Sequence, residues 1–104
     1  KRTIEIRSAD AVPIEESIGF CALWTGILYG ELEAADRFAA EFARATQLPV
    51  EVGFAHAARA GLAGEHGNGR TLVDWSRALL AIARSGLRDC RERPLPGGTN
   101  FRCV

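Results

Sequence analysis

The stretch Ile18–Gly30, IGFCALWTGILYG, is the longest apolar run in this chain of 104 residues. At about 13 residues it is shorter than the roughly 20 that a helix needs to cross a bilayer. It is also too far from the N-terminus, with no basic run before it, to be a signal peptide. We therefore expect a buried helix from Ile14 to Tyr29 that stops at Gly30, with Trp24 in the core.

The sequence before this helix predicts a strand. Thr3 to Arg7 alternate polar and β-branched residues with period two, so Ile4 and Ile6 would face a core while Glu5 and Arg7 share the other face. A lone strand leaves its backbone groups unpaired, and no second convincing strand follows. We expect the chain to be a piece of something larger, with the strand joining a sheet outside it. Asp10 and Pro13 indicate a helix start.

Helical periodicity resumes after Gly30. A second helix is expected to begin at Leu32 and to end before Pro49, because proline disfavours helical geometry in the preceding residue. The segment Glu51–Leu62 is ambiguous and could hold one short helix around Phe54–Arg59. The apolar positions of the second helix are Leu32, Ala35, Phe38, Ala39 and Phe42.

The glycine-rich segment Gly64–Arg70, GEHGNGR, is expected to be a loop. It lacks the lysine and hydroxyl pair of a phosphate-binding P-loop, which favours a plain connector with a helix start at Thr71 over a nucleotide cradle. The last helix should cover Leu72–Ser85 with Gly86 as its cap, and residues 89–104 should form an irregular tail. Its buried stripe would be Leu72, Leu79, Ile82 and Ala83, with Trp75 on the flank.

Composition narrows the class of protein. Basic and acidic residues number 13 each, so no net charge attracts nucleic acid or an anionic membrane, and neither partner is expected. The cysteines, Cys21, Cys90 and Cys103, are odd in number and irregularly spaced, which argues against a disulfide framework and against a zinc site. A reducing, cytoplasmic location fits best. The fold class expected is α+β, with one N-terminal strand followed by three to four helices.

Spacing alone does not identify an enzyme. Glu5 and Arg7 could be a solvated strand face, or Glu5 could supply oxygen to a hard cation such as Mg²⁺ while Arg7 binds a carboxylate or phosphoryl group. His56 and His66 have no acidic or thiol partner at ligand spacing and are expected on the surface. Tyr29 is expected in the core rather than at a ligand platform.

Three motifs, in order, resemble a known family. They are TIEIRSAD (Thr3–Asp10), ALWTGILYG (Ala22–Gly30) and GLAGEHGNGRTLVDWSRALLAIARSGL (Gly61–Leu87). Together they are similar to the C-terminal part of glutamate–cysteine ligases of the plant and proteobacterial type, where LEMRGAD leads into FWVGLLYD and a helix with IA-x-x-GL closes the domain. The first also resembles an element of the related glutamine synthetases. The order agrees up to about Arg88, so the resemblance implies that residues 1–88 are the C-terminal portion of a ligase catalytic domain, followed by the tail.

The resemblance implies an ATP-dependent ligase that forms γ-glutamylcysteine from glutamate and cysteine through γ-glutamyl phosphate. The implied fold is that of the glutamine synthetase catalytic domain, an antiparallel sheet with helices packed outside. By position, Glu5 matches a ligand of an active-site Mg²⁺, and Arg7 matches an arginine that contacts the substrate glutamate or the transferred phosphoryl group. ATP would bind mostly to residues outside this chain, so the chain alone should be inactive.

Departures from the family pattern leave alternatives open. Ser8 replaces a glycine, Gly30 stands where the ligases often have aspartate, and Thr3 stands where the synthetases have arginine. The amine acceptor could differ from cysteine. The chain could instead be a helical interaction module that keeps the scaffold without the chemistry. If the chain belongs to a ligase, it needs an upstream part of the enzyme or a partner chain to be active.

Overall fold

The structure is a computed structural model that describes residues 3–92. This part of the chain is mostly helical, with one small two-stranded antiparallel sheet, so it is an α+β arrangement. The elements are α1 (Ile14–Tyr29), α2 (Leu32–Arg44), α3 (Val50–Ala60), the 3₁₀ turn η1 (Gly61–Ala63), β1 (Glu65–Gly67), β2 (Arg70–Thr71) and α4 (Leu72–Glu92).

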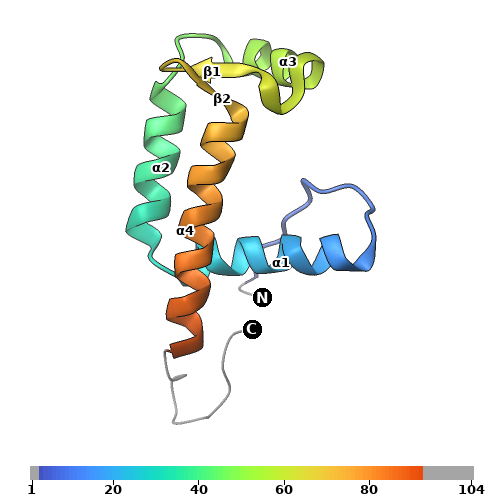
Figure 1. Cartoon of the computed structure of the whole chain (residues 1–104), viewed down its shortest axis with the longest axis vertical. Coiled ribbons are helices and arrows are strands. Elements are labelled where there is room, and N and C mark those ends of the chain that lie inside the picture. Colours follow the sequence, from blue (N-terminus) through green and yellow to red (C-terminus); the bar gives the residue numbers. More distant parts are fainter. Residues whose placement is uncertain (1–2, 93–104) are drawn as a thin grey trace.

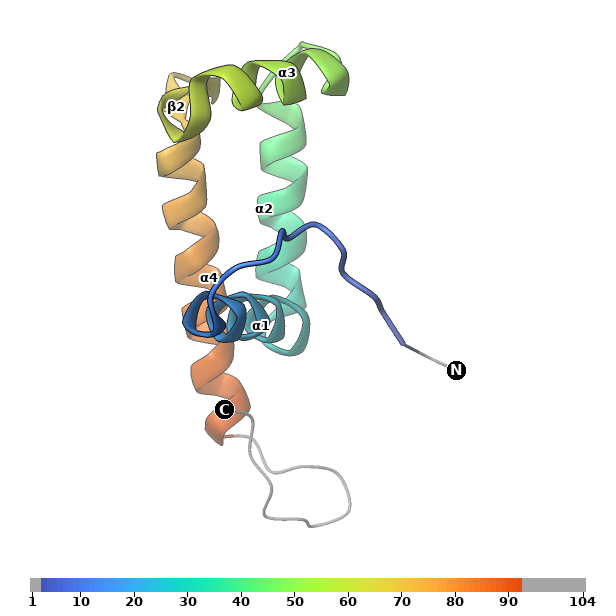
Figure 2. The same cartoon turned by 90° about the vertical axis from the view of Figure 1, so that its right-hand side faces the viewer.

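Two neighbouring helices set the shape of the molecule. Helices α2 and α4 lie side by side, α1 meets α4 near the lower end of α2 with the last turns of α4 extending beyond it, and α3 lies across the upper end beside the β1–β2 hairpin (Figure 1). In the view turned by 90°, α3 spans the ends of α2 and α4 while α1 is seen nearly end-on (Figure 2). Because α1 and α3 project to the same side, much of their surface has no neighbour among residues 3–92.

The largest helix–helix contact joins α1 to α4 and is made by small residues. A Cβ built on Gly26 would collide with the Ala83 backbone, and one built on Gly86 would collide with the Gly26 carbonyl oxygen. Gly30 meets the Gly86 backbone in the same way, and Cys90 Sγ donates a hydrogen bond to the Tyr29 carbonyl at 3.5 Å. Glycine at these points lets the two helices approach backbone to backbone.

Trp75 is the centre of the small core. It is 2% exposed and makes T-shaped contacts with Phe38 and Phe42 of α2, with ring centroids 6.0 and 5.3 Å away. We expected it on the flank of its helix, which was wrong, because α2 packs against that flank. The other buried apolar residues among those described are Ile27, Ala83 and Cys90.

The segment expected to be a loop forms a β-hairpin. Glu65 pairs with Thr71 and Gly67 with Arg70, around a two-residue turn at Asn68 and Gly69 whose φ angles are 56° and 69°. An Asn–Gly pair with positive φ at both positions is the preferred two-residue hairpin turn. The expected helix start at Thr71 is confirmed, since α4 begins at the next residue.

The expected N-terminal strand does not form within this chain. Residues 3–13 have no regular secondary structure, and Figure 2 shows them running from the start of α1 away from the helices. Ile4, expected to face a core, is 76% exposed. The physical reason is that a strand requires a hydrogen-bonded neighbour, and the two short strands described here pair with each other.

Three expectations about the helices also need correction. Gly86 is not a cap: α4 continues through it to Glu92, so residues 89–92 of the expected tail are helical, and 93–104 lie outside the described residues. The buried part of α1 is limited to Gly26 and Ile27, and Tyr29 is 66% exposed. Asp10 makes no cap, because Pro13 takes that position.

The short helix expected around Phe54–Arg59 is longer than expected and extends over all of α3. No described helix combines the length and apolar character needed to cross a membrane.

Candidate functional site

Glu5 and Arg7 lie on the extended N-terminal segment. Arg7 Nε donates a hydrogen bond to Glu5 Oε1 at 2.8 Å, and the two side chains are 81% (Arg7) and 71% (Glu5) exposed. An ion pair so open to water contributes about 0–1 kcal/mol, so either group can exchange its partner for another charged group at little cost. The structure therefore places Glu5 and Arg7 in contact with each other. Within residues 3–92, no third side chain forms a hydrogen bond or ion pair with either of them.

The described residues do not by themselves fit a Mg²⁺ site. No group of three or more histidine, cysteine or carboxylate side chains that could hold a metal occurs in residues 3–92. Glu5 offers one carboxylate, and its Oε1 already faces the cationic Arg7. A magnesium ion takes six oxygen ligands in near-octahedral geometry, several of them often water. Further protein ligands would have to come from outside this range.

His66 is not the surface residue that its spacing predicted. Its ring stacks on Phe42 with centroids 3.7 Å apart, and its Nε2 is 2.8 Å from the Phe42 carbonyl oxygen. The His66 ring also makes a T-shaped contact with Trp75, with centroids 5.9 Å apart, and the Arg70 guanidinium lies 4.2 Å from the centre of the Trp75 ring. His66 thus ties the hairpin to the last turn of α2. Among the described residues, His66 therefore stabilises the packing of the hairpin against α2.

An apolar groove of about 400 Å³ opens beside this cluster. It lies between the C-terminal end of α2, one face of α3 and the hairpin, at the end of the molecule remote from α1 (Figure 1). Val50 and Phe54 of α3 are 83% and 78% exposed, so much of the lining faces water. Its polar groups are Thr46, His56, Glu65 and His66.

The sequence does not indicate this groove. The segment Glu51–Leu62 is ambiguous in its pattern, although Val50, Gly53, Phe54 and Ala57 recur at helical spacing and form one apolar face. That signal could have identified the helix. It could not have shown that the face stays open, since this depends on where α2 and the hairpin lie.

Asp74 has a defined electrostatic environment at the start of α4. Its Oδ2 accepts hydrogen bonds from the Thr71 backbone N–H and hydroxyl, both at 3.1 Å, while Thr71 Oγ1 accepts from the Asp74 N–H at 3.4 Å. These bonds lower the pKa of Asp74 from its ordinary value of 3.8, and the bond from the Thr71 backbone N–H has the largest effect. The positive charges of Arg70 and Arg77 lower this pKa further. This reciprocal arrangement is a capping box that fixes the N-terminus of α4.

Comparisons with protein families, with curated proteins and with solved structures gave no match to this chain.

Proposed function

We propose that this chain is the C-terminal part of an ATP-dependent carboxylate–amine ligase of the glutamate–cysteine ligase type. The observation that carries the proposal is the extended segment that holds Glu5 and Arg7. Residues 3–12 contribute no backbone–backbone hydrogen bond within the described part of the chain, and both charged side chains face water. A segment with this pattern can join a sheet of another part of the enzyme and bring both side chains to a shared site.

The proposed reaction has two steps. A γ-carboxylate oxygen of glutamate attacks the γ-phosphorus of ATP, and the bond from that phosphorus to the bridging oxygen of ADP breaks. The amine of cysteine then attacks the acyl carbon; the bond to phosphate breaks and the amine releases a proton. The products are γ-glutamylcysteine, ADP and phosphate.

Arg7 suits the binding of anions in these steps. Its guanidinium is always charged and presents a planar fork that matches a carboxylate or a phosphoryl group. When it turns to a substrate anion, it leaves Glu5 Oε1 free to accept another cation. We propose that Glu5 then supplies one oxygen ligand to Mg²⁺, with the remaining ligands provided by the other part of the enzyme and by water.

A second candidate function is a non-catalytic helical interaction module. The apolar groove favours it, because Val50 and Phe54 remain exposed there and an uncovered apolar surface commonly marks a contact with another molecule. The two candidates differ in what Glu5 and Arg7 do. A module that binds only through the groove needs neither of them.

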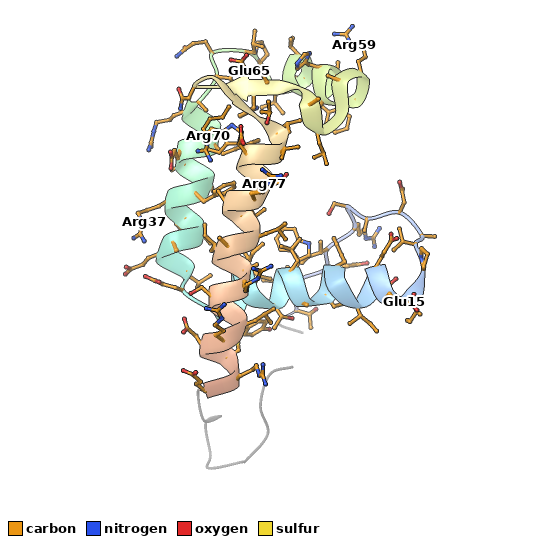
Figure 3. All side chains as sticks on the ribbon, viewed as in Figure 1. Glu15, Arg37, Arg59, Glu65, Arg70 and Arg77 are labelled. Carbon is orange, nitrogen blue, oxygen red and sulfur yellow. The ribbon has the colours of Figure 1, made fainter. Side chains whose placement is uncertain are left out.

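Transfer of ¹⁸O tests the ligase proposal. The chain, reconstituted with the polypeptide that supplies the rest of the site, is given ATP, cysteine and glutamate labelled in its γ-carboxylate. We expect one labelled oxygen in each phosphate released, and turnover at least about 100-fold lower in the Arg7→Gln variant. Arg59→Gln, which removes a charge at the far end of α3, is the matched control (Figure 3).

Unlabelled phosphate would contradict the acyl phosphate route. Equal turnover in the Arg7→Gln and Arg59→Gln variants would contradict the role of Arg7. Labelled phosphate formed with another amine but not with cysteine would keep the ligase chemistry and change the acceptor. Absence of any ATP turnover in the reconstituted protein would favour the interaction module.

A further inference from the structure

The outer face of α4 carries an unusual distribution of charge. Arg77, Arg84 and Arg91 recur every seven residues, and Arg88 lies on the same side of the helix. All four are exposed, and within residues 3–92 none lies within ion-pair distance of a carboxylate. The chain as a whole is neutral, so this row is a segregation of charge rather than part of a general excess.

On helix α2, by contrast, positive and negative side chains alternate. Glu33, Arg37, Glu41 and Arg44 alternate in sign at spacings of three or four residues, the pattern by which a solvated helix balances its own charges. On α4, Arg77 and Arg88 each have one carboxylate at such a spacing, Asp74 and Glu92, without an ion pair to either. Arg84 and Arg91 have no carboxylate three or four residues away within residues 3–92. Figure 3 shows Arg37 on the outer side of α2 and Arg77 on the side of α4 that faces away from α2.

An apolar row runs beside the arginines. Val73, Leu80 and Leu87 also recur every seven residues, about 40–60° around the helix from the arginine row. Leu80 is 52% exposed, and the other two are half-buried. The buried residues of α4, Trp75, Ala83, Gly86 and Cys90, lie on the far side of the helix from the arginines, and the apolar row lies between the arginines and this buried side. We call the combined surface of these two rows the heptad face.

We propose that the heptad face binds an amphipathic helix whose apolar seam is flanked by glutamate or aspartate. Helices pair when apolar residues repeat every seven positions, and charges beside the seam select the partner. The face extends about 21 Å along α4, enough for three turns or more of a partner helix. This inference does not depend on the proposed ligase function, because it concerns neither Glu5 nor Arg7.

Charge complementarity selects this occupant over other polyanions. A nucleic-acid backbone or an anionic membrane would be attracted by the arginines alone, and the neutral chain offers no wider basic surface to support either. The apolar row of Val73, Leu80 and Leu87 needs an apolar surface to pack against, which phosphate groups do not provide. An acidic helix satisfies both rows at once, with carboxylates opposite Arg77, Arg84 and Arg91 and leucine-type side chains opposite Leu80 and Leu87.

A binding experiment with a synthetic helix tests the proposal. The probe is a fluorescent peptide of three heptads with leucine at the two seam positions and glutamate at the flanking ones; the second probe has lysine in place of glutamate. Binding to the full 104-residue chain is followed by anisotropy. The triple variant Arg77→Gln, Arg84→Gln, Arg91→Gln is compared with Arg37→Gln, Arg44→Gln, Arg59→Gln, which removes the same charge from α2 and α3.

We expect saturable binding of the glutamate peptide, loss of affinity by about tenfold or more in the α4 triple variant, and little change in the matched control. A Leu80→Asp variant should lose binding as well, and circular dichroism checks that each variant keeps its helix content. No binding of the glutamate peptide, or equal binding of the lysine peptide, would overturn the proposal. The proposal would also be overturned if Leu80→Asp kept its affinity for the glutamate peptide and the parent chain bound duplex DNA or phosphatidylserine vesicles as tightly as this peptide. That result would identify a general polyanion surface.

Discussion

At the scale of single residues, the glycines of α1 and α4 have the clearest physical role. Glycine in a helix interior costs about 1 kcal/mol relative to alanine, so its presence requires a compensating contact. Gly86 has one, because a Cβ at this position would overlap the Gly26 carbonyl oxygen. The sequence suggested a helix cap at Gly86, since a glycine after a periodic stretch usually ends a helix. That inference failed because the residue that permits a close crossing looks the same in sequence as one that ends a helix.

We predict that Gly86→Ala destabilises the chain by about 1–3 kcal/mol, because the cost of overpacking exceeds the gain in helix propensity. Gly53→Ala in α3 is the matched control, since a Cβ at that position has nothing within 4 Å. It should stabilise the chain by up to about 1 kcal/mol. Urea unfolding followed by circular dichroism measures both. A stabilising Gly86→Ala would show that α1 and α4 do not approach as closely as described.

At the scale of elements, the capping box of α4 predicts a dependence of stability on pH. Asp74 has a lowered pKa in the folded chain, so its contribution is complete above the ordinary value of 3.8 and is lost as the pH falls through the lower folded value. Asp74→Ala should therefore lower the midpoint of thermal unfolding at about pH 7 and have a much smaller effect at about pH 2. Asp36→Ala, on the exposed side of α2, is the control. An effect of Asp74→Ala that is equal at both pH values would argue against the box.

Elements with strong periodicity were predictable and those fixed by distant contacts were not. The bounds of α1 matched because Pro13 and Gly30 flank one continuous apolar stretch. The hairpin could have been inferred from Asn68–Gly69, but the glycines around it were also consistent with a plain loop. His66 contacts Phe42, which lies 24 positions away in the sequence, so a local sequence pattern could not predict this contact.

At the scale of the whole molecule, the chain is open rather than compact. Its radius of gyration is 15.9 Å, against about 13 Å for a compact domain of 100 residues. Large apolar side chains remain exposed at both ends, among them Ile4, Ile14, Ile18, Val50 and Phe54. The charged pair of the candidate site could be named from sequence, whereas its lack of further partners within the described residues became visible only in the structure.

We predict that the isolated chain self-associates through its N-terminal segment, because Ile4 is exposed and the backbone beside it makes no backbone–backbone hydrogen bond with residues 3–92. Sedimentation velocity over a range of concentrations should show oligomers for the parent chain and fewer for Ile4→Lys. Val52→Lys, an equal change on α3, is the control. A monomeric parent chain at high concentration would contradict the prediction.

We propose that Glu5 belongs to the active site of a ligase, and the dependence of ATP turnover on Mg²⁺ tests this most directly. In the reconstituted enzyme, Glu5→Ala should raise the Mg²⁺ concentration needed for half-maximal turnover by about 10–100-fold or abolish turnover, while Glu15→Ala, at the exposed tip of α1, should leave it unchanged (Figure 3). The same turnover and the same Mg²⁺ dependence in the Glu5→Ala variant and the parent enzyme would contradict the claim.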